Sequence, residues 1–458
     1  MHMPAHQATF LKLAQCLRQH LFGNTRKAPM EYACARPSAM LRMERVQDHA
    51  GPLGREDFQY SPRRTVFAPL LVRSAGFHRV VTILCRLGLA AATLYGAAYS
   101  LFPEIVMNKA LIVGSTGIVG SATAQLLVEK GWDVTGLARR PAALAGVTPI
   151  SADLLDAAST RRALAGVAPS HVYITTWSRQ ASEVENIRVN AAMVRHVLDA
   201  LDDAGSVEHV ALVTGLKHYL GPFEAYGKGV LPQTPFREEQ GRLDIDNFYY
   251  AQEDEVFAAA ARGAYRWSVH RPHTITGVAV GNAMNMATTL AVHASICRAT
   301  GRPFQFPGSA VQWNSLTDMT DARLLARHLL WASTTPGAAN EAFNIVNGDV
   351  FRWSWMWRRI AEWFDIEPAP FDGTIRPLEQ QMANDAAIWH DIASREGLAE
   401  PDIHRLVSPW HTDADLGRPI EVVTDMSKSR RLGFLDYQAS DQAFFDVFER
   451  LRRERLIP

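Results

Sequence analysis

The stretch ALIVGSTGIVG, residues 110–120, decides the fold of this chain. Its first four residues form an apolar run, which is typical of a buried parallel strand, and a helical pattern follows over residues 121–130. Between the two, Gly114, Gly117 and Gly120 have the GxxGxxG spacing of a dinucleotide-binding loop. The first glycine allows a tight turn, the second lets the backbone approach a pyrophosphate, and the third permits close packing of helix on strand. The start of such a helix supplies N–H donors and positive potential for phosphates.

Beyond residue 130, strand-like and helix-like segments alternate. The expected strands cover residues 133–137, 171–175, 209–213, 268–270 and 343–346, and the expected helices cover 157–165, 183–204, 250–262 and 351–364. This alternation predicts an α/β fold of Rossmann type, a doubly wound parallel sheet with helices on both faces. Four tryptophans in the last helix favour core packing over an exposed stacking platform. Past Gly277 the periodicity loosens, which predicts a smaller C-terminal region that binds the substrate.

The end of the second predicted strand indicates which dinucleotide is bound. A site for NAD has an acidic residue there, which accepts a hydrogen bond from the ribose 2′-hydroxyl. This chain has Arg139 and Arg140 instead, and two guanidiniums suit a 2′-phosphate. We therefore expect NADP(H) as the cofactor, with a merely solvated arginine pair as the alternative. Asp153 and Leu154, which follow the next strand after 133–137, fit the place where the adenine amino group is usually held.

The charge distribution divides the chain near residue 106. Residues 1–106 hold 13 Lys and Arg against 6 Asp and Glu, whereas the remainder holds 34 against 41. We expect residues 1–106 to be an N-terminal extension that is disordered or a non-native start, residues 107–277 to be an NADP-binding Rossmann domain, and residues 278–458 to be mainly the substrate-binding region, with some segments returning to the sheet. A membrane anchor over residues 87–102 is the alternative for the extension, but about 16 apolar residues are fewer than the roughly 20 that a bilayer needs.

Composition and cysteine usage exclude several kinds of function. A mildly acidic body argues against a nucleic-acid partner. Of the four cysteines only Cys297 lies outside the basic extension, and no Cys/His spacing indicates a metal site. We expect a reduced, cytoplasmic protein with no bound metal and no membrane association, for which a homodimer is one possible assembly.

A tyrosine and a lysine on different segments form the predicted reacting centre. Tyr249 lies in the run NFYYAQED, where a short-chain dehydrogenase keeps its catalytic tyrosine, but the residue four positions later is Glu253 rather than lysine. Lys217 occurs instead in the run TGLKHYLGPF. A phenol and an ammonium that reach one oxygen from two segments favour enone reduction over alcohol oxidation. Two alternatives stay open: Tyr250 as the active phenol, and Lys217 as a plain surface residue.

Six motifs occur in order within residues 109–458: GSTGIVG, the double arginine, TGLKHYLGPFEAYGK, NFYYAQED, WSVHRP and NEAFNIVNGDVFRW. Together they resemble the progesterone 5β-reductase/iridoid synthase-like (PRISE) family of atypical extended short-chain dehydrogenases/reductases. The resemblance implies NADPH-dependent 1,4-reduction of an activated carbon–carbon double bond, in which hydride goes to the β-carbon. A tyrosine, helped by a lysine, holds the developing enolate; by motif these are Tyr249 and Lys217.

The resemblance also implies further contacts with the ligands. Beside the cofactor it places Thr116, Gly117, Ile118, Arg139, Arg140, Asp153, Leu154, Thr176, Trp177, Val213 and Ile275, near the cofactor phosphates Asn282, Ala283 and Met284, and on the substrate wall Phe223. His273 departs from the family's usual glycine, which adds bulk near the nicotinamide carboxamide.

These patterns predict an NADPH-dependent reductase of a small hydrophobic enone or enal. A phenol donor at the carbonyl oxygen lowers the barrier because negative charge develops there, and a nearby ammonium is expected to lower the pKa of the phenol. One alternative is an NAD(P)-dependent sugar-nucleotide epimerase or dehydratase, which needs a base from a Tyr-x-x-x-Lys helix and is disfavoured by Glu253. Another is a non-catalytic NADP(H)-sensing Rossmann protein, because fold alone does not establish function.

Overall fold

The computed structural model describes residues 32–33, 40–41, 107–222, 232–282 and 284–458. The chain divides into two compact units, residues 1–94 and 95–458. In the first unit the described residues form β1 (Tyr32–Ala33) and β2 (Met40–Leu41), which pair antiparallel. The predicted extension, with its alternative of an anchor over residues 87–102, otherwise lies outside the described residues. The other described residues, from 107 onward, belong to the second unit.

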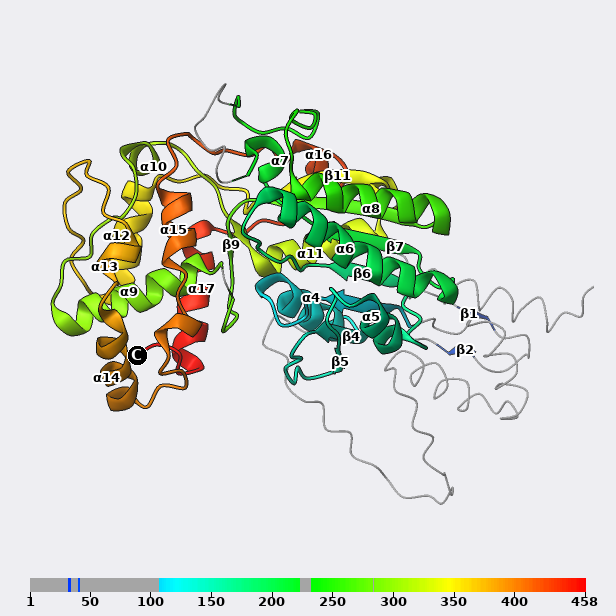
Figure 1. Ribbon diagram of the computed structural model, residues 1–458, viewed down its shortest axis with the longest axis horizontal. Coiled ribbons are helices and arrows are strands. Elements are labelled where there is room, and N and C mark those ends of the chain that lie inside the picture. The colour runs from blue at the N-terminus through cyan, green and yellow to red at the C-terminus, as the bar shows by residue number, and fades with distance from the viewer. Residues whose placement is uncertain (1–31, 34–39, 42–106, 223–231, 283) are drawn as a thin grey trace, which may run out of the picture. The chain divides into compact units, whose positions relative to one another are not determined.

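Seven parallel strands form the central sheet, in the order β11-β8-β7-β6-β3-β4-β5 (Figure 1). They are β3 (Lys109–Val113), β4 (Asp133–Ala138), β5 (Val147–Ser151), β6 (His171–Ile174), β7 (His209–Val213), β8 (Arg266–Pro272) and β11 (Glu341–Ile345). From β3 the chain runs outward to β4 and β5, then returns to β6 on the other side of β3. The carboxyl ends of β3 and β6 therefore flank the switch point, where open α/β sheets bind their ligands.

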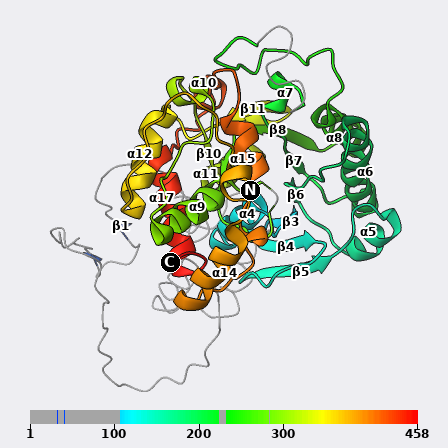
Figure 2. The same ribbon diagram turned by 60° about the vertical axis from the view of Figure 1, so that its left-hand side comes forward.

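Helices cover both faces of this sheet, as Figure 2 shows. On one face lie α5 (Ala157–Leu164), α6 (Glu183–Leu201) and α8 (Phe248–Gly263), and on the other α4 (Ile118–Glu129) and α11 (Ala322–Thr334). Alternate residues of β3 enter the two cores: Leu111 packs with the first group, and Ile112 with the second. This confirms the predicted Rossmann-type doubly wound sheet.

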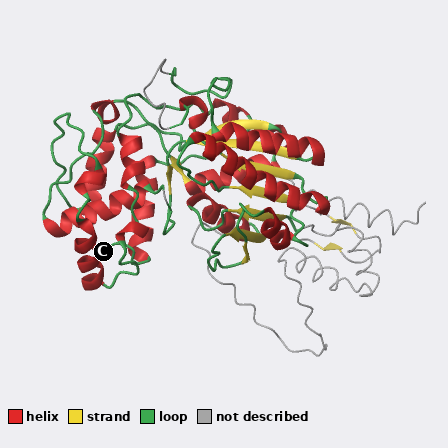
Figure 3. Ribbon diagram, viewed as in Figure 1, coloured by secondary structure: helices red, strands yellow, loops and turns green. Residues whose placement is uncertain are grey.

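A third hydrophobic cluster is built from helices of the C-terminal region (Figure 3). These are α9 (Met286–Thr300), α12 (Trp353–Phe364), α14 (Asp385–Glu396), α15 (Pro409–Leu416) and α17 (Ser440–Arg453). Trp353 and Trp357 of α12 are buried as expected, whereas Trp355 is 39% exposed. Although α11 and β11 follow residue 277, they join the sheet layer. The division of the chain at that residue stays a prediction.

Shorter elements complete the described fold. They are α7 (Lys217–Leu220), α10 (Ala310–Asn314), α13 (Leu378–Gln381), α16 (Ser427–Arg431), the parallel pair β9 (Ile275–Thr276) and β10 (Thr320–Asp321), and 3₁₀ turns at Asp202–Ala204, Pro336–Ala338 and Ile403–Arg405. No helix of the described residues is long and apolar enough to cross a bilayer.

Two helices begin earlier than the sequence pattern indicated, and both differences concern the site. The helix expected from residue 121 begins at Ile118, so the glycine loop leads directly into its first turn. The helix expected from residue 250 begins at Phe248, because the Asn247 side chain accepts a hydrogen bond from the Tyr249 backbone N–H and caps it. Tyr249 therefore lies in the first turn of α8, at the carboxyl edge of the sheet.

Candidate active site

The three loop glycines meet the geometric demands predicted for them. Gly114 has φ +93°, a conformation that favours glycine, and its N–H donates to the Leu137 carbonyl at 2.8 Å. A Cβ on Gly120 would lie 2.1 Å from the Gly114 carbonyl oxygen, which excludes any side chain there. A Cβ on Gly117 would meet only that carbonyl, at 3.3 Å, and the Asn282 amide nitrogen at 3.9 Å. The loop therefore has the shape that a pyrophosphate requires.

The segment expected near the phosphates does face this loop. Asn282 is tethered by two hydrogen bonds: its side-chain oxygen accepts from the Met284 N–H at 2.9 Å, and its carbonyl accepts from the Ser408 hydroxyl at 3.2 Å. No side chain caps the N-terminus of α4 at Gly117, so the first amides of that helix remain directed at the loop. Ala283 lies outside the described residues.

The residues expected around the adenosine lie at the ends of β4 and β5. Arg139 and Arg140 follow β4 directly, both are exposed, and neither forms an ion pair with another described residue. A Ser151 hydroxyl donates to the Arg139 carbonyl at 3.0 Å and fixes the backbone there. Asp153 is exposed, with one carboxylate oxygen accepting from the Leu155 N–H at 3.1 Å. These positions suit a ribose phosphate and an adenine, but the contacts themselves remain predictions.

The other predicted cofactor neighbours lie at the carboxyl edge of the sheet. Thr116 belongs to the glycine loop, Ile118 opens α4, Thr176 and Trp177 follow β6, Val213 ends β7, and Ile275 begins β9. Thr176 lies against the loop, since its Cβ is 2.8 Å from the position of a Cβ on Gly114. The structure thus gathers these residues at the switch point. Phe223, predicted on the substrate wall, lies outside the described residues.

The two adjacent tyrosines have different surroundings. The Tyr250 hydroxyl donates to the His218 carbonyl at 2.6 Å and accepts from the Leu243 N–H at 3.0 Å, so it is committed to the fold. The Tyr249 hydroxyl forms no hydrogen bond with any described residue, and it lies 3.2 Å from the position that a Cβ on Gly215 would take. This geometry favours Tyr249 over Tyr250 as the reacting phenol.

Lys217 approaches the same place from a second segment. It is the first residue of α7 and is largely buried, with its ammonium 5.1 Å from the ring centre of Phe248 and 5.3 Å from that of Trp177. Those two rings stack at 5.2 Å, and the Tyr249 ring lies 4.4 Å from Phe248. The ammonium and the phenol are therefore neighbours of one aromatic ring. The burial of Lys217 does not fit a plain surface lysine.

Asn247, to which the sequence argument gave no role, joins the two segments. Its side-chain oxygen caps α8 at the Tyr249 N–H, at 3.0 Å, and its amide nitrogen donates to the Lys217 carbonyl at 2.7 Å. An asparagine before a helix predicts the capping bond. The second bond spans 30 residues of sequence, and no local pattern announces it.

The phenol is kept in its protonated form. Burial, and after it the carboxylates of Glu183 and Asp415, raise the pKa of Tyr249 above its usual value. This direction is opposite to the lowered pKa that we expected from a nearby ammonium. Glu183 is fixed close by, because it accepts from the Phe248 N–H at 2.8 Å. A protonated phenol is a hydrogen-bond donor, which is the form that an enolate oxygen requires.

Glu253 is buried in an ion-pair network. Its carboxylate lies 2.9 Å from the Arg242 guanidinium and 3.4 Å from that of Arg271. Arg271 also donates to the Tyr219 hydroxyl at 3.4 Å, which ties α8 to the α7 segment that carries Lys217. A lysine at position 253 would place a third cation beside two arginines. The lysine of the usual Tyr-x-x-x-Lys helix is therefore incompatible with this environment.

His411 and Asp415 on α15 are further buried residues near the phenol, and the sequence argument did not find them. Their spacing of four residues puts them on one helical face. A single His-x-x-x-Asp pair is too common in sequences to identify a site. Only the fold shows that this pair is buried beside the site.

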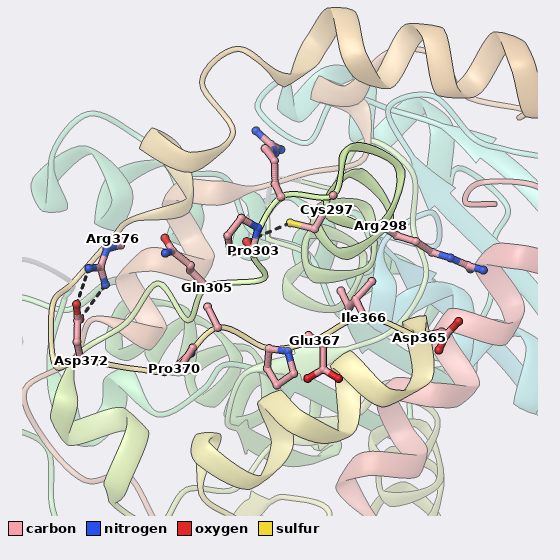
Figure 4. Close-up of a pocket in the computed structure, with 14 residues that line it drawn as sticks. Cys297, Arg298, Pro303, Gln305, Asp365, Ile366, Glu367, Pro370, Asp372 and Arg376 are labelled. Atoms are coloured by element: carbon pink, nitrogen blue, oxygen red, sulfur yellow. Dashed lines mark hydrogen bonds and ion pairs between the residues drawn. The ribbon is translucent and has the colours of Figure 1, made fainter.

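A separate open cavity of about 620 Å³ lies at the far end of α9 (Figure 4). Its wall includes Cys297, Arg302 and Glu367, and at one edge of it Arg376 and Asp372 form an ion pair at 2.6 Å. Cys297 is 12 residues beyond the Asn285 cap of α9, which is about 18 Å along the helix axis. This cavity is therefore distinct from the Tyr249 site.

Solved structures with the same fold are extended short-chain dehydrogenase/reductase enzymes. An epimerase from Methanothermobacter thermautotrophicus superposes with a TM-score of 0.56 at 14% identity, covering 76% of this chain and 93% of the epimerase. An enzyme of Bordetella bronchiseptica in complex with NAD+ gives 0.52 at 16% identity, covering 76% and 99%. At these identities the likeness concerns the fold. Fold and glycine loop together define the class: a Rossmann-type doubly wound α/β protein with a glycine loop of the dinucleotide-binding kind.

Sequence comparison identifies the family within that class. Residues 161–458 match the PRISE-like Rossmann-fold domain. An (S)-8-oxocitronellyl enol synthase from Camptotheca acuminata is 36% identical over 370 residues, covering 78% of this chain and 95% of the synthase. A 3-oxo-Delta(4,5)-steroid 5-beta-reductase from Arabidopsis thaliana is 37% identical over 365 residues, covering 77% and 93%. The chain belongs to the PRISE-like family, which confirms the resemblance drawn from its motifs.

Proposed function

We propose that the protein is an NADPH-dependent reductase of activated carbon–carbon double bonds, acting on an enone or enal. The observation that carries the proposal is the Tyr249 hydroxyl: a buried, protonated donor with no hydrogen bond to another described residue, beside the switch point of the sheet. The names of the relatives from Camptotheca and Arabidopsis, an enol synthase and a 3-oxo-steroid reductase, support the same chemistry.

Tyr249 and Lys217 both stabilise the negative charge on the carbonyl oxygen, each in a different way. NADPH, when bound, supplies the hydride that goes to the β-carbon. The Tyr249 hydroxyl donates a hydrogen bond to the carbonyl oxygen, where negative charge grows as the enolate forms. The Lys217 ammonium, which also lies beside Phe248, adds positive potential, and Asn247 bonds to the Lys217 backbone and to that of Tyr249. Protonation of the enolate then gives the saturated carbonyl compound.

No side chain is needed as a general base in this reaction, and the structure is consistent with that. Glu253 is buried and paired with two arginines, so it is not available to remove a proton. An epimerase or dehydratase would require such a base. Arg139 and Arg140, exposed at the end of β4, support NADPH over NADH because they can receive a 2′-phosphate.

The test is NADPH oxidation by the purified full-length protein with cyclohexenone and hexenal, followed by loss of NADPH absorbance. We expect turnover with NADPH, and at least tenfold lower kcat/KM with NADH. The double variant Arg139→Ala/Arg140→Ala should remove this preference without lowering activity at saturating NADH. Tight binding of NADPH with no turnover over a broad enone panel would show that the protein only binds the nucleotide.

A further inference from the structure

Five polar residues, four of them buried, gather beside the reacting centre and are here called the polar cluster: His273, Thr274, Asp318, His411 and Asp415. All but the half-buried Thr274 are nine-tenths or more inaccessible to solvent. Two of them follow β8, Asp318 precedes β10, and two lie on α15. A purely hydrophobic substrate would form no hydrogen bond with these side chains.

The His273 ring presents an unused hydrogen-bond acceptor. Its Nδ1 lies 2.8 Å from a carboxylate oxygen of Asp318, whose other oxygen accepts from the Thr424 N–H at 2.6 Å. A carboxylate accepts hydrogen bonds, so the ring carries a proton on Nδ1, and whenever it carries no second proton its lone pair is on Nε2. That Nε2 is closed to solvent and has no partner among the described residues.

His411 presents a second acceptor of the same kind. Its Nε2 faces the Asp415 carboxylate at 3.7 Å, which favours the proton on Nε2, and its buried Nδ1 has no hydrogen-bond partner in the described part of the chain. Burial lowers the pKa of His411; Asp415 opposes this, and Arg418, Lys217 and Arg179 reinforce it. The ring is therefore neutral near pH 7, with its lone pair on Nδ1.

Asp415 completes the cluster as a third acceptor. It accepts from the Thr274 hydroxyl at 2.5 Å and lies 3.8 Å from the Arg418 guanidinium. Burial acts to raise the pKa of Asp415, but the Arg418 guanidinium, with the hydrogen bond from Thr274, opposes it, and the pKa lies below its usual value. The group is therefore a carboxylate at neutral pH.

The cluster borders the proposed reacting pair. The Pro272 carbonyl and the Tyr249 hydroxyl both lie 3.2 Å from the position of a Cβ on Gly215, and His273 is the next residue after Pro272. The charge of Asp415 acts on the Tyr249 phenol, and the charge of Lys217 acts on the His411 ring. A molecule held by Tyr249 is therefore within reach of the cluster.

We propose that the polar cluster is a substrate subsite that accepts a hydrogen bond from a hydroxyl group, so the natural enone or enal carries a hydroxyl beyond its conjugated carbonyl. Two imidazole lone pairs and a carboxylate all call for a donor, and a site built to bind a hydroxyl discriminates against the analogue that lacks it. The inference rests on the proposed function and narrows its substrate class.

The test uses matched substrates that differ in one hydroxyl: 2-hexenal, 4-hydroxy-2-hexenal and 6-hydroxy-2-hexenal. Binding to the protein–NADP+ complex, which cannot transfer hydride, is measured by calorimetry, and kcat/KM is measured with NADPH. We expect at least one hydroxylated compound to bind roughly tenfold to hundredfold more tightly than hexenal, with a matching gain in kcat/KM.

Two variants and one control locate the effect. His273→Asn keeps a donor near the position of Nδ1 for Asp318 but has no atom at the position of Nε2, and Asp415→Asn removes the carboxylate with little change in shape. Both should lose the preference for the hydroxylated compound, measured within each variant as the ratio of the dissociation constants for hexenal and the hydroxylated compound. His404→Ala, which removes an exposed imidazole of the same region, should retain the preference.

Each outcome decides a separate question. Equal binding of hydroxylated and plain compounds overturns the subsite, whether or not turnover is seen. Tighter binding of a hydroxylated compound without turnover supports the subsite and contradicts the proposed function. If His273→Asn weakens NADPH binding and leaves the hydroxyl preference intact, the free imidazole nitrogen serves the nicotinamide carboxamide and the subsite proposal is wrong.

Discussion

The nucleotide side and the substrate side of this site are assembled differently. The glycine loop is contained in seven consecutive residues, Gly114 to Gly120, and one strand–helix turn produces its geometry. On the other side, the Asn247–Lys217 bond spans 30 residues, the His273–Asp318 pair 45, and the Thr274–Asp415 bond 141. A locally encoded site can be read from sequence, whereas an assembled one becomes visible only in the fold. Each prediction below tests this contrast.

The largest effect is expected where the lost lysine is restored. Glu253→Lys recreates the Tyr-x-x-x-Lys spacing, but it places a cation between Arg242 and Arg271 in a buried position. Breaking a buried pair in this way costs about 3–5 kcal/mol, so we expect a large loss of stability and no dehydrogenase activity. Urea unfolding measures it.

The matched control is Asp254→Lys, on the next residue of α8. The Asp254 side chain is 62% exposed and pairs with Arg242 at the surface, so its replacement should cost about 0–1 kcal/mol. A stable Glu253→Lys protein that oxidises alcohols would show that local spacing, rather than the assembled network, decides the chemistry.

The next effect concerns the barrier of the reaction. Tyr249→Phe removes a donor from the carbonyl oxygen, which typically costs about 3–4 kcal/mol, or roughly a hundredfold to a thousandfold in kcat. The affinity for NADPH should be almost unchanged. Steady-state kinetics with cyclohexenone and NADPH titration by fluorescence separate the two quantities.

Tyr250→Phe is the control one position away. It removes buried hydrogen bonds to the His218 carbonyl and from the Leu243 N–H, so it should lower the free energy of unfolding by about 1–3 kcal/mol. Its effect on kcat should be much smaller than that of Tyr249→Phe. The reverse ranking would assign the reaction to Tyr250.

The locally encoded side can be tested in the same way. In Gly120→Ala the new Cβ would lie 2.1 Å from the Gly114 carbonyl oxygen, and such overpacking costs about 1–3 kcal/mol of stability. Gly117→Ala meets that oxygen only at 3.3 Å, so it should fold normally and weaken NADPH binding instead. Thermal unfolding with and without NADPH distinguishes the two; equal stability of both variants would contradict this assignment of the glycines.

The outcomes of the sequence predictions follow the same division. The strand–glycine–helix pattern predicted the sheet, its parallel direction and the conformation of the glycine loop, since each depends on a few adjacent residues; the place of the nucleotide stays a prediction. The pairing of Tyr249 with Lys217 was available only through family motifs, and the structure supplies its cause in Asn247 and the Glu253 network. His411 and Asp415 gave no signal, because a polar residue in an unpatterned segment looks the same whether it faces solvent or a buried site.

A buried histidine chain in the sheet layer is another assembled feature. His209 Nε2 and His270 Nε2 each lie 2.9 Å from the Ser268 hydroxyl, and the His270 and His328 Nδ1 atoms lie 2.8 Å apart. His328 Nε2 reaches the Ser429 hydroxyl at 3.0 Å. One of the two facing Nδ1 atoms must donate and the other accept, so at least the accepting ring must be neutral.

The smallest effect per group on stability is expected from protonation of these histidine rings at low pH. Burial lowers the pKa of His209 and of His328 from the ordinary 6.5 to about 3 in the folded protein, and burial also lowers that of His270. Between the two pKa values the unfolded chain binds more protons than the folded one, so stability is complete above about pH 6.5 and falls as the pH drops towards 3. At one pH unit below 6.5, each imidazole should lower the free energy of unfolding by about 1 kcal/mol. Urea unfolding at about pH 7.5 and 5.5 measures the loss, and His328→Gln, which cannot take up the proton, should reduce it; an unchanged loss in that variant would place the acid sensitivity elsewhere.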